Sequence, residues 1–284
     1  MGIDPVVTGS AKGRRARIAA FLCEPLDAAD AAAGRRPFDR SRDLRLLAIV
    51  VAGAICILLR STVFTDRPVL FVNTVDALGF DDAALYLYRL FENADDGRFN
   101  KMLFWAFGSV LCYVLLPAAV LKALGLRLRD HGVRWLHRRD LGLYAVLLLG
   151  IAPLVAFAAT QPSFVHAYPM YVPSEAEPLF GRFAVFECAY MVQFVAVEFF
   201  FRGFLLHGVK ERAGGLLAVL FPLIPYVMVH IGKPPLEAMA AVAAGLILGF
   251  LSLRSGSIAF GIVLHAAVAL SMDLAALWMR GVIG

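Results

Sequence analysis

Charged residues are scarce in this chain. Only 17% of its 284 residues are Asp, Glu, Lys or Arg, whereas 60% are hydrophobic. A soluble domain is about half apolar and about a quarter charged, so this composition excludes an ordinary soluble globular domain. It indicates one integral membrane protein rather than two soluble domains.

Paired cysteines and common metal signatures are also absent. Cys23, Cys56, Cys112 and Cys188 stand singly, with no CxxC and no HExxH sequence anywhere in the chain. This pattern excludes a thiolate metal site or a disulfide framework, and it leaves the cysteines as small apolar packing residues. Residues 1–42 lack an apolar segment long enough for a signal peptide, so no cleavage is expected.

Long apolar runs are abundant. A transmembrane helix needs about 20 apolar residues, and six runs reach or approach that length: 44–64, 102–124, 141–160, 183–206, 236–254 and 256–279. A seventh run, 215–231, contains Pro222 and Pro225, which predict a kinked or late-starting helix because proline lacks a backbone donor. We therefore predict an all-α, polytopic transmembrane helix bundle of about seven spans, with the more polar segment 68–91 outside the membrane or at its surface.

Basic residues gather at the ends of alternate runs. The connection 122–139 carries six Lys or Arg and one acid, whereas 65–101 carries seven acids and four bases. Since Lys and Arg are enriched in cytoplasmic loops, the alternation predicts a plasma-membrane protein with its N-terminus in the cytoplasm. The same placement explains the net charge of +5 without a nucleic-acid partner, so the lipid bilayer is the expected surrounding.

The chain divides into three parts on this basis. Residues 1–42 form a basic cytoplasmic tail, 43–182 hold the N-terminal spans and loops, and 183–284 form a C-terminal core. Ionisable residues inside the predicted spans concentrate in the last part: Glu198, Arg202, His230, His265 and Asp273. Charged side chains at membrane depth are costly and usually face the bundle interior. We predict that the last four spans build one polar site, which the first three shield.

Glu198 and Arg202 are four residues apart, so they share a helix face and can pair. That pair alone is explained equally well by a structural link between helices. His230 and His265, on separate spans, favour an assembled site, because a glutamate can activate water while histidines hold it or stabilise an oxyanion. Activated water requires no cofactor, although a divalent metal such as zinc on Glu198, His230 and His265 is a chemical alternative.

Three stretches carry a family resemblance: VEFFFRGFLL (197–206), YVMVH (226–230) and HAAVA (265–269). In order and spacing they resemble the three motifs of the CPBP family of intramembrane proteases, which includes the type II CAAX prenyl endopeptidases. The resemblance covers about residues 183–279. It implies an intramembrane peptide-bond hydrolase acting on a peptide or membrane-protein substrate, and it leaves the oligomeric state open.

The resemblance also implies roles for the site residues. Glu198 and His230 would hold and deprotonate a water, His265 would stabilise the oxyanion, and Arg202 would position Glu198. Two positions depart from the family pattern. Val197 replaces the first glutamate, which usually activates the water, and Ala269 replaces the Asn or Asp after the last histidine.

Two interpretations of these departures compete. In the first, Glu198 takes over as base and Asp273 supports the site, although on an ideal helix Asp273 lies about 80° round and about 12 Å along from His265. In the second, the chain is a catalytically inactive membrane scaffold. A transporter is a third alternative. We favour the hydrolase.

The predicted depths of the site residues disagree. With straight helices, His230 lies about 22 Å from the cytoplasmic end of its span and Glu198 about 12 Å from the end of its own. A late start of the fifth span near Pro222 would remove the mismatch. Glu187 and His207 are predicted near the membrane surfaces.

Overall fold

The structure is a computed structural model that describes residues 40–93, 96–135, 140–172 and 181–283, with the single residues 24, 28 and 31. The predicted basic tail, 1–42, therefore lies mostly outside the described residues. Within them all regular structure is helical, which confirms the all-α prediction. The helices are α2 (Arg40–Thr62), α3 (Val69–Ala77), α4 (Asp81–Glu92), α5 (Gly97–Val110), η1 (Leu111–Leu115), α6 (Leu116–Ala123), η2 (Leu128–His131), α7 (Leu141–Ala159), α8 (Pro162–Ala167), α9 (Arg182–Glu198), η4 (Phe199–Leu206), α10 (His207–Met228), α11 (Pro235–Ser255) and α12 (Ala259–Met279).

Six helical segments of the described chain are long and apolar enough to cross a membrane: Arg40–Thr62, Gly97–Ala123, Leu141–Ala159, Arg182–Met228, Pro235–Ser255 and Ala259–Met279. They match the predicted runs to within a few residues at most ends. The fourth segment is 47 residues long and contains two of the predicted runs, 183–206 and 215–231. The prediction of about seven spans therefore becomes six continuous helical segments, one of which is divided.

Gly214 divides that long segment. Its backbone angles, φ 79° and ψ 170°, are not helical, and glycine adopts them without the steric cost of a Cβ atom. The chain turns back at this residue, since the Arg202 guanidinium before it lies 4.1 Å from the centre of the Tyr226 ring after it. The two predicted runs are thus antiparallel limbs on either side of Gly214.

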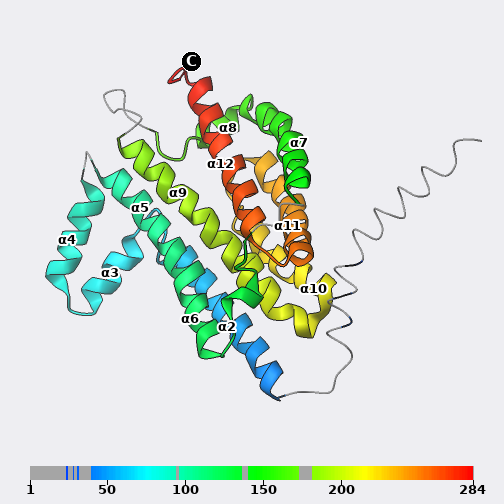
Figure 1. Ribbon diagram of the computed structural model, residues 1–284. Helices are drawn as coiled ribbons and strands as arrows, with labels where there is room; N and C mark the ends of the chain where they lie inside the picture. Colours follow the sequence, from blue (N-terminus) through cyan, green and yellow to red (C-terminus); the bar gives the residue numbers. More distant parts are fainter. Residues whose placement is uncertain are drawn as a thin grey trace, which may run out of the picture.

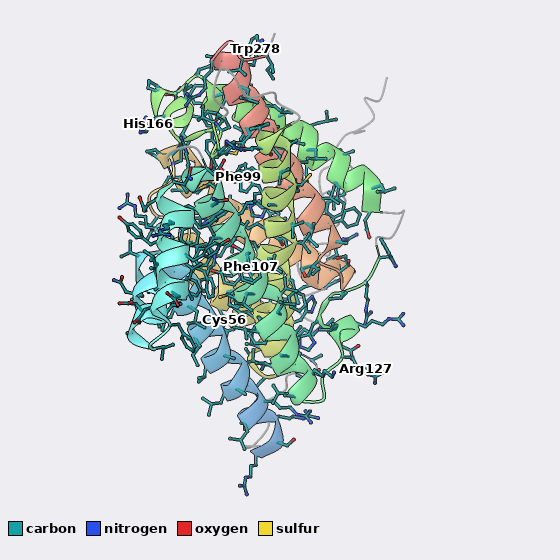
Figure 2. The ribbon with its side chains drawn as sticks, turned by 90° about the vertical axis from the view of Figure 1, so that its left-hand side faces the viewer. Cys56, Phe99, Phe107, Arg127, His166 and Trp278 are labelled. Carbon is teal, nitrogen blue, oxygen red and sulfur yellow. The ribbon has the colours of Figure 1, made fainter. Side chains whose placement is uncertain are left out.

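The long helix α9 runs through the bundle between two neighbours (Figure 1). It packs against α5 on one side and α12 on the other, and α7 covers a further side of α12. The short helices α3 and α4 form a hairpin beside α5 (Figure 1). Arg127, in the basic connection, and Trp278, near the end of α12, lie at opposite ends of the bundle (Figure 2).

The centre of the bundle is the π-helical segment η4. All eight of its residues are buried, as expected for a helix surrounded by other helices. Tyr113 of η1 stacks on Phe200, with ring centroids 4.5 Å apart. In lipid, helices associate through close packing and hydrogen bonds rather than through the hydrophobic effect. This aromatic packing therefore fixes the position of the residues that flank η4, including Glu198.

Two glycines let α11 approach α10 closely. A Cβ atom on Gly245 would lie 2.4 Å from the Leu223 side chain, and one on Gly249 would lie 3.1 Å from Val219. The spacing of four residues puts both glycines on one face of α11, as in the small-residue interfaces typical of membrane helices. The α10–α11 hairpin, which carries His230 at its turn, depends on this close contact.

We expect Gly245→Leu to destabilise the bundle by about 1–3 kcal/mol, because the added side chain has no room beside Leu223. The midpoint of thermal unfolding in detergent measures the effect. Gly150→Leu on α7 is the matched control, since no atom lies within 4 Å of a Cβ at Gly150. Equal midpoints for the two variants would contradict the packing described here.

Candidate active site

Glu198 is the last residue of α9 and is fully buried. It lies at the centre of a group of polar side chains, Glu198, Arg202, His230 and His265, called the polar cluster below. One of its oxygens, Oε1, accepts two hydrogen bonds. Nη1 of Arg202 donates at 2.9 Å and Nδ1 of His265 at 3.0 Å. Arg202 belongs to η4 and His265 to α12, so a single carboxylate oxygen joins two elements that are far apart in the sequence.

Arg202 makes burial of this carboxylate feasible. Its side chain is itself almost completely buried, and its guanidinium lies over the Tyr226 ring at 4.1 Å from the centroid. A buried charge without a partner costs several kcal/mol, whereas a hydrogen-bonded pair of opposite charges is neutral overall. The aromatic face adds a favourable cation–π contact. The two ionised groups in this apolar stretch therefore compensate each other.

The second carboxylate oxygen, Oε2, faces the backbone of α12. A Cβ atom on Gly261 would lie only 2.4 Å from it, so no other residue fits there without displacing Glu198. Among the described residues Oε2 has no hydrogen-bond partner. Gly261 lies one turn before His265 on the same helix, which explains how α12 brings that histidine to Oε1.

His230 lies in the turn that follows α10. Its Nδ1 is 2.7 Å from the backbone carbonyl oxygen of Tyr226. A carbonyl oxygen can only accept, so Nδ1 carries the hydrogen, and in the neutral ring Nε2 is left as an acceptor. The Tyr226 ring contacts both histidines, with centroid distances of 4.7 Å to His230 and 6.2 Å to His265. No hydrogen bond joins His230 to Glu198 within the described part of the chain.

The turn at Gly214 brings Glu198 and His230 to similar depth. Each lies 16 residues from Gly214, which corresponds to about 24 Å of helix on either limb. The predicted mismatch arose from ending the fourth span at residue 206. The helix continues through the charged residues after it, and the fifth span needs no late start near Pro222.

Comparison with known proteins gave a match that covers the part of the chain containing Glu198 and His230. Residues 180–271, about a third of the chain, match the family model described as type II CAAX prenyl endopeptidase Rce1-like. The match supports the resemblance of this segment, here called the CPBP domain, to the CPBP family. Searches of curated proteins and of solved structures gave no match. The matched segment contains Glu198, Arg202, His230 and His265, whereas Asp273 lies beyond its end.

Both departures from the CPBP pattern lie in apolar surroundings. Val197, only 8% exposed, packs in the cluster that contains Phe200 and Phe201. Ala269 packs with Tyr190 and Phe194 in a second cluster. The two positions where the family carries polar side chains are therefore filled by apolar packing.

Asp273 is placed away from the CPBP cluster. It is fully buried on α12, two turns beyond His265, and its carboxyl group lies against that of Glu187 on α9. All four oxygens of the two carboxyl groups are buried and accept no hydrogen bond from a described residue, so a hydrogen bond between the groups would need a proton on one carboxyl. Asp273 therefore lies beside Glu187, which is buried within the bundle.

His207 is also buried. It is 4% exposed, and its Nε2 lies 3.0 Å from the Ser252 hydroxyl of α11. It is thus a packed residue between α10 and α11. Glu237 lies in the first turn of α11, as expected for a carboxylate near a helix N-terminus, and accepts a hydrogen bond from the Tyr168 hydroxyl.

The possible metal ligands that the structure describes in the CPBP domain are not gathered around one point. No group of three His, Cys, Asp or Glu side chains in the described segments is arranged to hold a metal ion. Oε1 of Glu198 is already bonded to Arg202 and His265, and Oε2 faces Gly261. These three side chains, Glu198, His230 and His265, are therefore not grouped as ligands in the structure, and the zinc alternative on them stays a prediction.

Tyr226 and Gly261 contact the polar cluster, although the sequence alone did not predict these contacts. Tyr226 opens the second motif, but its contacts with Arg202 and both histidines depend on the turn at Gly214. Gly261 carries a weaker signal, its position one turn before His265.

We expect Arg202→Met to destabilise the protein by about 3–5 kcal/mol, because Glu198 is then buried without its countercharge. A second variant, Glu198→Met combined with Arg202→Met, removes both charges and should recover much of the loss. Thermal unfolding in detergent compares the two. If the double variant were less stable than the single one, the pair would not be the compensated charge pair described here.

Proposed function

We propose that the CPBP domain hydrolyses a peptide bond in a peptide or membrane-protein segment at the membrane. The hydrogen bond between Glu198 and His265 supports the proposal most directly. A carboxylate held against a histidine nitrogen is the arrangement that prepares a histidine as a general base. Membership of a CAAX endopeptidase family supports a protease as the reaction class.

The geometry favours His265 as the base. Its Nδ1 donates to Glu198, so in the neutral ring Nε2 carries the free lone pair. Glu198 has one oxygen bonded to two donors and the other directed at Gly261, which leaves it poorly placed to contact water itself. In this scheme Glu198 positions His265, whereas the sequence alone suggested that Glu198 takes the proton.

His230 supplies a second neutral imidazole at the same depth. Its Nδ1 is held by the Tyr226 carbonyl, so Nε2 can accept a hydrogen from the same water. His265 would remove a proton from that water as its oxygen attacks the carbonyl carbon of the substrate. The same proton then passes to the departing amine, which completes hydrolysis without any added reactant.

A non-catalytic scaffold is the second candidate. The apolar packing of Val197 and Ala269 favours it, because the family's usual base and the polar partner of its last histidine are replaced. In that case the Glu198 pair would only hold α9, η4 and α12 together.

Cleavage by the purified chain in lipid nanodiscs separates the two candidates. Wild-type protein is incubated with prenylated and unprenylated peptides, and products are identified by mass spectrometry. We expect His265→Ala and His230→Ala to lower the cleavage rate at least about 100-fold, as for loss of a general acid–base group, and Glu198→Gln to lower it strongly. Asp273→Asn is the matched control and should stay near wild type, since Asp273 contacts Glu187 instead.

Two outcomes would count against hydrolysis at this site. Cleavage that is equal in wild type and in both histidine variants would assign the activity to another site. A folded wild-type protein that cleaves none of the peptides would favour the scaffold.

Chelation tests the role of metal. Because the donors of the CPBP cluster do not form a ligand set, we expect cleavage to persist after dialysis against a strong chelator. The rate is measured before and after dialysis, and again after zinc is added back. Loss on chelation with recovery on zinc would show that metal takes part and would replace the histidine-base scheme.

A further inference from the structure

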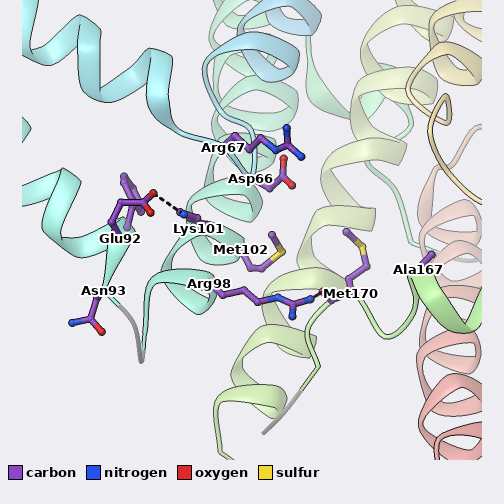
Figure 3. A pocket seen from close by; sticks show the side chains of 10 residues that line it. Asp66, Arg67, Glu92, Asn93, Arg98, Lys101, Met102, Ala167 and Met170 are labelled. Atoms are coloured by element: carbon purple, nitrogen blue, oxygen red, sulfur yellow. Dashed lines mark hydrogen bonds and ion pairs between the residues drawn. The ribbon is translucent and has the colours of Figure 1, made fainter.

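A cavity of about 450 Å³ lies outside the CPBP domain's polar cluster. Its wall combines the connection after α2, the end of α4, the start of α5, the end of α8 and the segment after α8 (Figure 3). Three of its residues are cations, Arg67, Arg98 and Lys101, and two are acids, Asp66 and Glu92. The remaining wall is largely apolar.

The cavity lies at the level of lipid headgroups. Helix α2 has 23 residues and is about 34 Å long, slightly more than the hydrocarbon core of about 30 Å. Asp66 and Arg67 follow just after its end, and Arg98 lies at the start of the next span. The cavity therefore opens where a span leaves the hydrocarbon, which is the depth of the phosphate groups.

The cations are only partly neutralised. Lys101 pairs with Glu92 at 2.7 Å, and both residues are drawn on the cavity wall in Figure 3. Arg98 reaches across to the backbone carbonyl of Met170 at 3.3 Å. Neither Arg67 nor Arg98 is within 4 Å of a carboxylate of a described residue, although Asp66 is beside Arg67. With three cations against two carboxylates, the wall keeps one positive charge in excess.

The wall also carries an apolar surface. Phe91, Met102, Ala167 and Met170 line the cavity together with the charged residues. Arginine presents a fork of N–H donors that matches a phosphate, and apolar side chains beside it suit a glycerol backbone and the first carbons of an acyl chain. A phosphodiester carries one negative charge, which equals the excess on the wall.

We propose that this cavity binds the phosphate of a phospholipid headgroup, with Arg67 and Arg98 as the main contacts. Basic pockets beside transmembrane helices are a recognised way to hold lipid headgroups. A lipid held here would contact α4, α5 and the segment after α8 at once. The site is separate from the proposed peptidase, so neither depends on the other.

Native mass spectrometry of the full chain in detergent tests the proposal. Phosphatidylglycerol is titrated in parallel with a diacylglycerol of the same chains, which lacks the phosphate. We expect the phospholipid to bind and the diacylglycerol to bind at least about tenfold more weakly. Inorganic phosphate at millimolar concentration should displace part of the bound phospholipid, since it competes for the same guanidinium groups.

Variants then locate the site. Arg67→Gln with Arg98→Gln should lower phosphatidylglycerol affinity at least about tenfold. Arg89→Gln is the matched control, because Arg89 is exposed on α4 and does not line the cavity, and this variant should bind phosphatidylglycerol like wild type.

Equal affinity in the double variant and wild type, or equal binding of the two lipids, would overturn the proposal. If inorganic phosphate binds but no phospholipid does, the cavity is a site for free phosphate and the proposal of a lipid headgroup is overturned. If the double variant fails to fold, the comparison of the two lipids on wild type decides.

Discussion

The contact of Glu198 with Arg202 and His265 is the interaction on which the domain depends. It places a carboxylate in a bundle that lipid surrounds, and such a group is tolerated only when its charge is compensated at short range. The other features of the site follow from this requirement. The Tyr226 ring covers the guanidinium, Gly261 leaves room for the carboxylate, and the aromatic packing of η4 holds Arg202 in place.

Helices from both halves of the chain pack around the polar cluster. Helices α2 and α6, together with η1, pack against η4, and α5 packs against α9. His230 follows α10 and His265 lies on α12, which also packs against α9. The polar groups are consequently enclosed by packed side chains. Because the site is formed between helices, the sequence of any single helix gives little information about it.

Much of the fold and part of the site could be predicted from the sequence. The spans follow from run length alone, because lipid demands about 20 apolar residues per helix. The convergence of Glu198, Arg202 and His265 follows from the cost of exposing them to lipid. The end of the fourth span was predicted too early, because the charged residues from His207 to Arg212 suggested a loop, whereas they continue the helix beyond the apolar segment.

Partners across helices could not be predicted in the same way. The approach of Glu187 to Asp273 depends on the register of α9 against α12, and that register is set by close packing around Gly261 and Ala269. A sequence shows which residues share a face of one helix. It does not show which residue of a neighbouring helix stands opposite.

The turn at Gly214 has a consequence for how this domain tolerates change in length. One residue inserted between Glu198 and Gly214 would rotate the carboxylate by about 100° and shift it by about 1.5 Å, and one inserted before His230 would do the same to the imidazole. Insertions in either limb therefore misalign the two groups even when every side chain is kept. The geometry of the site therefore depends on the number of residues in each limb as well as on their identity.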